Sequence, residues 1–419
     1  MGARNVLRAP RNREFACSIP STLELRCIAL LWVIVAATLS ACSTPRLAAV
    51  PSDATTRAAI PGIPEARLWP DLEPDAYVRI ALRKIERERT ALGEVNVSLD
   101  RLPAIDLLAI SGGGDAGAFA AGVMCGWTAR GDRPQFNVVT GISVGALIAP
   151  FAFLGPAYDD VIRRIATESG PADFLRARTT LGGLLSDGLT TSEPLARLVE
   201  RYVTPEVLGA IAEKYREGRV LLIGTTDLDA GTRVVWDMGA IATSNAPNAL
   251  ELFRKVMIAS TSIPGVVSPV MIDVQVDGVP HQEMHVDGGV ITQLFLYPGF
   301  VGPTLRQQLG VRAPRPMRGW VIRNGRLAPE WTSTQRRTLD IGSRAIRAMV
   351  QTQGINDLRR IAALVDEDGL DLRLAYIGAE FQAPHPSEFD TAYMKALFDY
   401  GFRLGRSGEA GHTGLPGPD

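Results

Sequence analysis

Apolar runs along the middle of the chain alternate with amphipathic stretches, which predicts strands interleaved with helices. Continuous apolar runs at 105–110, 136–140 and 220–225 are typical of strands in a sheet core. Helical patterns begin at Ala118 and Ala146, a few residues after the first two runs. The alternation predicts an α/β domain.

The later part of the chain adds two hairpins and more helices. The stretch 233–238 alternates polar and apolar residues and is expected to pair with 220–225, while 271–276 and 282–286 form a second hairpin around Asp277-Gly278. Further strands are predicted at 319–323 and 372–377, and helices at 248–259, 333–365 and 389–404. Residues 407–419 have the composition of a disordered tail.

The N-terminus has the pattern of an export signal. Basic residues precede an apolar run at 27–39 that is too short to span a bilayer comfortably, and the run ends in Leu39-Ser40-Ala41-Cys42. This segment resembles bacterial lipoprotein signals, which implies removal of residues 1–41 and lipidation of Cys42. The alternative is an uncleaved N-terminal anchor, which also leaves the protein held at a membrane.

A lipid-anchored protein of this kind is expected in the bacterial cell envelope. Ser43 stands where an aspartate commonly retains such proteins at the inner membrane, so the outer membrane is the favoured destination in an organism that has one. Residues 42–70 are rich in Ala, Pro, Ser and Thr and are predicted to form a flexible tether. The remaining length, 71–406, fits one large α/β domain.

Charge and cysteine content exclude several functions. The formal net charge of −1 lacks the basic bias of a nucleic-acid-binding protein. Once residues 1–41 are removed, Cys125 has no disulfide partner and is predicted to be a core thiol. No calcium loop or zinc-ligand pattern is present, so no metal is expected. The sequence does not indicate an oligomeric state.

The segment Gly141-Ile142-Ser143-Val144-Gly145 lies between a predicted strand and a predicted helix. A G-x-S-x-G serine becomes a nucleophile in this setting, because the sharp turn exposes it at the helix N-terminus. Gly141 and Gly145 leave room for the neighbouring strand and helix. The helix dipole and the free N–H groups favour the negative charge that develops when a hydroxyl attacks a carbonyl.

Two glycine turns accompany this serine. The run 105–110 ends in Ser111-Gly112-Gly113-Gly114, where consecutive glycines can aim several N–H groups at a phosphate or an oxyanion. A P-loop is disfavoured because no Lys-Ser/Thr pair follows. Downstream, a predicted strand ends at Asp287 and is followed by Gly288-Gly289, a combination that is also common in ordinary turns.

Taken in order, these three segments resemble the patatin-like phospholipase family, and Ala259-Ser260-Thr261-Ser262-Ile263-Pro264 resembles a segment that precedes Asp-Gly-Gly in that family. The resemblance covers about residues 104–300. It implies a three-layer α/β sandwich with a central, mostly parallel sheet, hydrolysis of lipid acyl esters, and no cofactor. Ser143 and Asp287 would form a Ser-Asp dyad, with Gly112, Gly113 and Gly114 at the oxyanion hole.

One position departs from the family pattern. Many members carry an Arg or Lys two residues after the third glycine, whereas Ala116 stands there in this chain, beside Asp115. A preference for phospholipids therefore does not transfer with the resemblance.

Histidine is the usual base for a serine nucleophile, and the chain has four. His412 lies in the glycine-rich tail, and His385, between two prolines, would need its loop to return over the site. His281 and His285 share one face of a predicted strand with Asp287, which keeps His285 as a rival base or as a residue that orients Asp287. Both are otherwise expected on a solvent-facing strand edge.

The sequence therefore predicts a serine acyl hydrolase that resembles a lipase or phospholipase. An aspartate, with a pKa of roughly 4, is a weak base for a serine hydroxyl, so a Ser-Asp dyad depends strongly on the glycine loop. Two alternatives remain open. One is a catalytically silent envelope lipoprotein that binds acyl chains or a partner, and the other is a carboxylesterase with a Ser-His triad.

Overall fold

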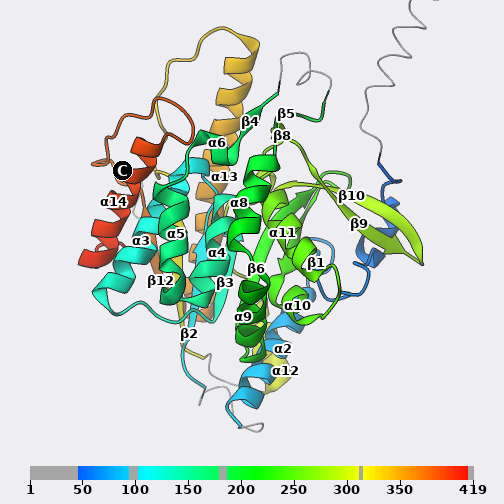
Figure 1. Cartoon of the computed structure of the whole chain (residues 1–419). Coiled ribbons are helices and arrows are strands. Elements are labelled where there is room, and N and C mark those ends of the chain that lie inside the picture. Colours follow the sequence, from blue (N-terminus) through cyan, green and yellow to red (C-terminus); the bar gives the residue numbers. More distant parts are fainter. Residues whose placement is uncertain (1–45, 94–101, 179–185, 311–314, 414–419) are drawn as a thin grey trace, which may run out of the picture. The chain divides into compact units, whose positions relative to one another are not determined.

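The computed structural model describes residues 46–93, 102–178, 186–310 and 315–413. Within them a ten-stranded sheet has the order β1-β7-β6-β3-β2-β11-β12-β13, and the β9–β10 hairpin joins it at β6 (Figure 1). The central strands β6, β3, β2, β11 and β12 run parallel, while β7 and β10 are antiparallel to β6. The strands are β1 (Arg67–Leu68), β2 (Ile105–Ile110), β3 (Val138–Ile142), β6 (Val220–Asp227), β7 (Thr232–Asp237), β9 (Val270–Val276), β10 (Val279–Asp287), β11 (Met317–Arg323), β12 (Asp371–Tyr376) and β13 (His412–Thr413).

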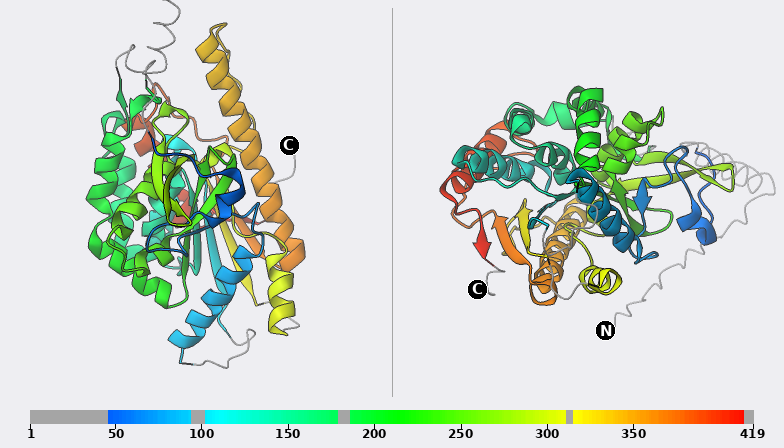
Figure 2. Two further views of the ribbon diagram at one scale, coloured as in Figure 1. Left: turned by 90° about the vertical axis from the view of Figure 1, so that its right-hand side faces the viewer. Right: turned by 90° about the horizontal axis from the view of Figure 1, so that it is seen from below.

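Helices cover both faces of the sheet (Figure 2). Successive side chains of a strand point to opposite faces, so Leu108 and Ile110 of β2 pack in one layer while Leu107 and Ala109 pack in the other. The layer on the Leu108 side contains α3 (Gly117–Arg130), α4 (Val144–Leu154), α5 (Asp159–Thr167), α8 (Glu193–Tyr202), α9 (Pro205–Arg216), α10 (Met238–Thr243), α11 (Ala249–Ser260) and α14 (Thr391–Ser407). The layer on the Leu107 side contains α2 (Ala76–Ala91), α12 (Val301–Leu309) and α13 (Thr338–Asp368). The predicted three-layer α/β sandwich is confirmed.

A small second sheet, in the order β4-β5-β8, consists of β4 (Arg176–Ala177), β5 (Gly188–Thr191) and β8 (Gly265–Val267). It lies at the same end of the domain as the first half of α13 (Figures 1 and 2). A short helix, α6 (Pro171–Phe174), leads into it. Among the described residues, no helix has the length and apolar character needed to cross a bilayer.

The prediction of a flexible tether at 42–70 is wrong for residues 46–70. A 3-10 helix spans Ser52–Arg57, and β1 pairs with β7 through Arg67 opposite Trp236. Ile60, Ile63 and Trp69 are buried in the main core. The small and apolar side chains of this segment fit between the β9–β10 hairpin and β7, so a Pro- and Ala-rich composition did not signal disorder here. Residues 1–45, including the expected signal peptide and Cys42, lie outside the described residues.

The predicted disordered tail also begins too early. Helix α14 continues to Ser407 and ends at Gly408 in the left-handed conformation. His412 and Thr413 then form β13, which pairs with β12 through Leu374 and Arg373. Residues 407–413 therefore belong to the domain, and 414–419 lie outside the described residues.

Candidate active site

β6 brings Ser143 and Asp287 together. Strand β3 runs parallel to β6 and its last residue, Ile142, lies opposite Gly224. Strand β10 approaches the same edge of β6 from the other direction and ends with Asp287 opposite Thr225, the next residue of β6. The carboxyl ends of two strands that are far apart in sequence therefore meet on consecutive residues of a third.

Ser143 occupies the sharp turn between β3 and α4. Its backbone has φ 55° and ψ −127°, a strained conformation for a residue with a side chain. A Cβ on Gly141 would lie 2.6 Å from the carbonyl oxygen of Gly145, and a Cβ on Gly145 would collide with the carbonyl oxygen of Ile110. The two glycines thus allow the turn to pack against its own helix and against β2.

A second serine supports this turn. The N–H of Ser143 donates to Oγ of Ser260 over 3.0 Å, and the Ser260 hydroxyl donates to the carbonyl oxygen of Gly224 over 2.7 Å. Ser260 ends α11 and belongs to the segment 259–264 singled out in the sequence, which gave no indication of this contact. It links the nucleophile turn to β6.

Asp287 is 5% exposed, and burial raises the pKa of its carboxyl from the ordinary value to about 6. Hydrogen bonding from the Ser143 side chain and from the N–H of Gly289 acts in the opposite direction and lowers this pKa. The Gly289 bond, to Oδ1, measures 2.7 Å. A desolvated carboxylate is a stronger base than one in water, so this environment suits proton abstraction from a hydroxyl.

Gly288 and Gly289 let the turn after Asp287 pack closely. A Cβ on Gly288 would lie 2.5 Å from the carbonyl oxygen of Gly224, and one on Gly289 would lie 2.5 Å from Nε2 of Gln293. The Gln293 amide donates to the carbonyl oxygen of Gly289 over 2.8 Å, and its backbone N–H donates to Asp357 of α13 over 2.6 Å. Gln293 and Asp357, which sequence reasoning missed, therefore brace the turn that carries Asp287.

The glycine loop lies against both the nucleophile and β11. A Cβ on Gly112 would lie 3.1 Å from Cβ of Ser143, and Gly113 has φ 148°. The N–H of Gly112 makes a long hydrogen bond of 3.4 Å with the carbonyl oxygen of Gln293. Within the described part of the chain, the N–H groups of Gly113 and Gly114 have no acceptor. These two groups are the available donors of the loop.

Asn324 holds the glycine loop through hydrogen bonds to Ser111 and to α3. Its Nδ2 donates to the carbonyl oxygen of Ser111 over 2.9 Å, its backbone N–H donates to Oγ of Ser111 over 2.8 Å, and its Oδ1 accepts from the N–H of Ala120 in α3 over 3.1 Å. Asn324 follows β11 directly. A polar residue immediately after a predicted parallel strand was a signal that could have identified it, because ligand and loop contacts gather at the carboxyl ends of such strands.

Ser143 is less accessible than the sequence suggested. The prediction placed it exposed at the helix N-terminus, but only 8% of the residue is exposed. The close approach of Gly112 and of the Asp287 turn covers it. A substrate must therefore reach the hydroxyl past the rim formed by these loops.

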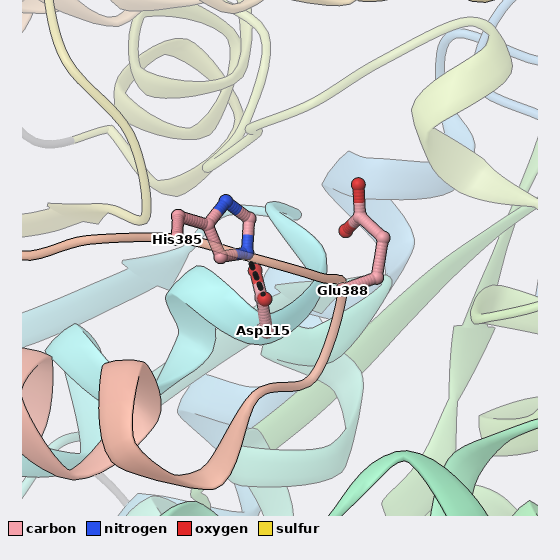
Figure 3. A group of neighbouring side chains, drawn as sticks. All are labelled: Asp115, His385 and Glu388. Atoms are coloured by element: carbon pink, nitrogen blue, oxygen red, sulfur yellow. Dashed lines mark hydrogen bonds and ion pairs between the residues drawn. The ribbon is translucent and has the colours of Figure 1, made fainter.

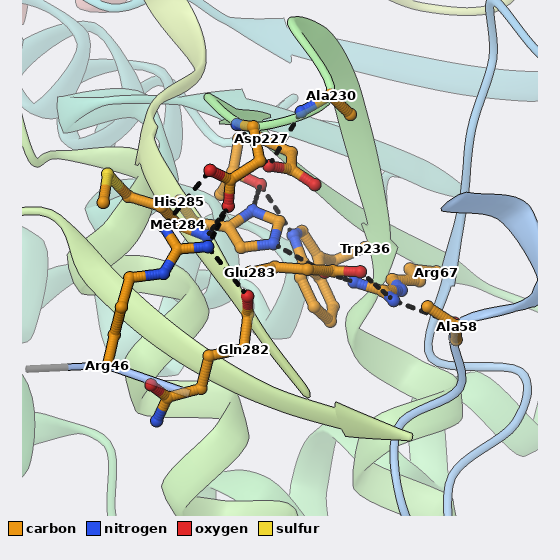
Figure 4. Close-up of polar contacts among 12 residues, drawn as sticks. Arg46, Ala58, Arg67, Asp227, Ala230, Trp236, Gln282, Glu283, Met284 and His285 are labelled. Carbon is orange, nitrogen blue, oxygen red and sulfur yellow. Dashed lines mark hydrogen bonds and ion pairs between the residues drawn. The ribbon is translucent and has the colours of Figure 1, made fainter. Parts of the chain in front are cut away.

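His285 is not positioned to act as the base. It is fully buried rather than on a solvent-facing edge, and its Nδ1 and Nε2 contact Oγ1 of Thr225 and Oε2 of Glu283, each at 3.0 Å (Figure 4). The indole N–H of Trp236 donates to the same Thr225 oxygen over 2.8 Å, so the Thr225 proton is directed to Nδ1 and the histidine proton to Glu283. Both ring nitrogens are thus occupied away from Ser143.

Arg67 completes this buried group of hydrogen-bonded side chains. It pairs with both carboxylate oxygens of Glu283, and although burial alone would raise the pKa of that carboxyl, the Arg67 charge and the histidine hydrogen bond lower it to about 2 (Figure 4). The group anchors β1, β6, β7 and β10 to one another. It holds β10 in the register that places Asp287 beside Ser143.

The other histidines also lie apart from Ser143. The ring of His281 contacts the carbonyl oxygen of Ala49 at 3.1 Å, and the ring of His412 packs against Tyr376 at a tilt of 40°. His385 does return toward the site, as its loop reaches the residue after the glycine loop: its Nε2 lies 2.7 Å from Oδ2 of Asp115 (Figure 3). A Ser-His triad therefore finds no support in the geometry.

Asp115 lies beside the position where many family members carry an Arg or Lys, and here it binds the loop at 385–389 that precedes α14. Besides His385, its Oδ2 accepts the N–H of Phe389 over 2.9 Å. Glu388 lies close enough to these two side chains that the three could share a cation, as could Asp227, Glu283 and His285 (Figure 3). In both groups the imidazole is already paired with a carboxylate, which accounts for the arrangement without a metal.

Cys125 is half-buried and its thiol contacts the carbonyl oxygen of Asp159 at 3.6 Å. Burial raises its pKa to about 12, so it is an unreactive thiol at neutral pH.

A layered parallel sheet with a strained serine between a strand and a helix is the arrangement typical of α/β acyl hydrolases. More specifically, residues 108–296 match the family model of the patatin-like phospholipases, and this chain therefore carries a patatin-like phospholipase domain. At the level of the family, this is a lipid acyl hydrolase domain.

Among solved structures, VipD from Legionella pneumophila is similar to this chain with a TM-score of 0.34 and 13% identity, over 73% of this chain and 67% of VipD. No curated protein matched the sequence.

Proposed function

We propose that the protein hydrolyses lipid acyl esters with Ser143 as nucleophile and Asp287 as base. The observation that supports this most directly is the meeting of the β3 and β10 ends on β6, which sets a strained serine beside a desolvated carboxylate. The family match supports lipid acyl hydrolysis in general. The residue roles rest on the geometry of this chain.

In the first step, the Ser143 oxygen attacks the ester carbonyl carbon while its proton moves to Asp287. The carbonyl oxygen becomes an oxyanion, and the N–H groups of Gly113 and Gly114 donate to it. The C–O bond to the alcohol then breaks, and Asp287 returns the proton to the departing alkoxide. Gly112 contributes the backbone that brings this loop against Ser143.

In the second step, water attacks the acyl-enzyme carbonyl and gives a proton to Asp287. The tetrahedral species collapses, the fatty acid leaves, and the proton passes from Asp287 to the Ser143 oxygen. Each step needs Asp287 ionised at its start. No step of this proposed mechanism uses a metal or an organic cofactor.

A fluorophosphonate probe tests the nucleophile. It should label the wild-type chain at Ser143 and leave Ser143→Ala unlabelled, while a control variant at an exposed serine on α14, Ser407→Ala, labels normally. Folded protein that takes up no probe, or a Ser143→Ala variant that still does, would show that the pocket is not a serine hydrolase site. The silent binding lipoprotein would then be the better interpretation.

We also propose that the mature protein is lipidated at Cys42 and held in the bacterial envelope, at the outer membrane where one exists. The support is the basic and apolar pattern before Leu39-Ser40-Ala41-Cys42. Metabolic labelling with a fatty acid should mark the wild-type chain but not Cys42→Ser. An unlabelled wild type in the membrane fraction would favour the uncleaved anchor instead.

A further inference from the structure

The first half of α13 projects past the rest of the domain, at the end where β4, β5 and β8 lie (Figures 1 and 2). Its second half is an ordinary packed helix, with Leu358, Ile361 and Leu364 at most 4% exposed. In the first half, Ile341 and Ile346 are each 53% exposed and Met349 is 71% exposed. The same helix thus carries apolar residues in the core and in solvent.

The exposed apolar residues form a broad stripe that consists of Ile341, Ala345, Ile346, Ala348 and Met349. At about 100° per residue they fall within about 160° of the helix circumference, and Arg344 and Arg347 fall outside that arc. Trp331, in the segment that leads into α13, is 89% exposed. A soluble protein exposes scattered apolar side chains, but a stripe on a projecting helix marks an interaction surface.

The stripe leads toward the candidate active site. Ala348 and Met349 line an open groove of about 490 Å³ whose opposite wall includes Ile291. Ile291 follows the Asp287-Gly288-Gly289 turn after a single residue, Val290, which is 44% exposed. The apolar face of the helix therefore ends beside the loop that carries the base.

Positive charge accompanies the apolar stripe. Between residues 331 and 349 there are four arginines, Arg336, Arg337, Arg344 and Arg347, and one carboxylate, Asp340. Arg336 and Arg337 are exposed, and Arg347 lies 4.0 Å from the exposed Glu388. The chain as a whole has a net charge of −1, so this excess is local.

We propose that the first half of α13, residues 338–354, docks the protein on an anionic phospholipid bilayer and so presents lipid to the active site. A helix with an apolar stripe flanked by arginines is the type that lies in a membrane interface. Anionic headgroups complement the arginines. A second copy of the chain packed on the same stripe would instead bring like charges together.

This inference rests on the proposed function, since it supplies the surface from which a nearly buried serine receives a lipid. Its own evidence is separate, because none of the stripe residues contacts Ser143 or Asp287. Docking and hydrolysis can therefore fail independently.

The test uses the mature chain, residues 42–419, with Ser143→Ala so that no lipid is consumed and with Cys42→Ser so that no acyl anchor binds the membrane. The vesicles contain equal parts phosphatidylglycerol and phosphatidylcholine. The chain should float with these vesicles, and the double variant Ile341→Glu, Ile346→Glu should bind at least about tenfold less, because two apolar side chains lose their burial. A second double variant, Arg336→Gln, Arg347→Gln, should bind several-fold less and with weaker dependence on salt. Pure phosphatidylcholine vesicles should bind less than the anionic ones.

The matched control is Val279→Glu, which adds an acidic group at an exposed valine of the β9–β10 hairpin, 56% exposed and away from α13. It should float like the parent. With Ser143 intact, the α13 variants should hydrolyse a soluble short-chain ester at the parental rate and vesicle phospholipid about tenfold more slowly.

The outcomes separate the two proposals. Flotation that depends on α13, without hydrolysis of any ester, would sustain docking and reject the enzyme. Ester hydrolysis with flotation and vesicle hydrolysis unaffected by the α13 variants would overturn docking and leave the enzyme. Docking would also be overturned if the unlipidated parent chain did not bind vesicles and sedimented as a dimer that Ile341→Glu, Ile346→Glu dissociates.

Discussion

Asp287→Asn should give a protein that is almost inactive but more stable than the wild type at neutral pH. Burial raises the pKa of Asp287 from 3.8 to about 6. A difference of about two units corresponds to about 3 kcal/mol against the charged form in the folded state. Asparagine has nearly the same volume, can still accept the Gly289 N–H, and carries no charge.

The pH dependence follows from the direction of this shift. The folded chain holds the Asp287 proton more tightly than the unfolded chain, so the folded state gains stability from this group at low pH and loses it as pH rises. The loss begins near the ordinary pKa of 3.8 and is complete once pH passes about 6. The Asn variant lacks this loss, so its advantage over the wild type should grow across that range to about 3 kcal/mol.

Urea unfolding of both proteins at a series of pH values measures this difference, and hydrolysis of a soluble ester measures the loss of the base, expected at roughly a thousandfold. Asp277→Asn, at an exposed aspartate whose side chain is 74% exposed, is the control and should change neither quantity. A stability difference that stays constant with pH would mean that the carboxyl is not desolvated. Full hydrolysis by Asp287→Asn would mean that the base lies elsewhere.

Four further predictions concern the site. The kcat/KM for a soluble ester should fall with a slope of one as pH drops below about 6, the raised pKa of Asp287, and a profile flat to pH 4 would argue against this base. Gly113→Ala should lower kcat by roughly 100-fold or more, because the added carbon meets the backbone of Asn324 and moves a donor of the loop. Gly114→Ala should lower kcat less, because its φ of 58° costs an alanine about 1 to 2 kcal/mol of strain but its Cβ position is open. Equal losses in kcat would contradict this prediction. Ser260→Ala should lower kcat roughly tenfold with KM nearly unchanged, because the Ser143 N–H loses its acceptor, and an altered KM alone would point to a different role. Glu283→Gln should lower the free energy of unfolding by about 3 to 5 kcal/mol, because the Arg67 charge stays buried without its partner. The pH profile of the remaining activity should be unchanged. A shifted profile would indicate that His285 and its hydrogen-bond partners titrate together with the active site.

The sequence was sufficient for the local part of the site. Strand, turn and helix around Ser143 follow from an apolar run and two glycines that are close together in the chain, and the observed β3 and α4 differ from the expected ranges by about two residues. The patatin-like resemblance, found from three short motifs, is confirmed by the family match. Local patterns of this kind need no information about distant contacts.

Long-range pairing was the part that the sequence could not supply. Alternation placed His281, His285 and Asp287 on one face of a strand, but it did not say whether that face meets solvent or core, and His285 turned out to lie at the buried crossing of β6 and β10. Asn324 and Ser260 act through contacts with segments more than a hundred residues away. For residues 46–70, a Pro- and Ala-rich composition suggested a tether, while the packing partners that order the segment lie in β7 and β9.

Because the two strand ends meet on β6, the site tolerates change in connections that carry none of its contacts. Loops between β7 and β9 can grow or shrink without altering the reacting atoms, provided that Ser260 of α11 stays in place and β10 keeps its register. A slip of a single residue along β6 would turn the carboxylate to the opposite face and leave the serine without a partner. Variation among related chains should therefore accumulate in those connections, and any insertion within β6 or β10 should mark a protein that has lost this chemistry.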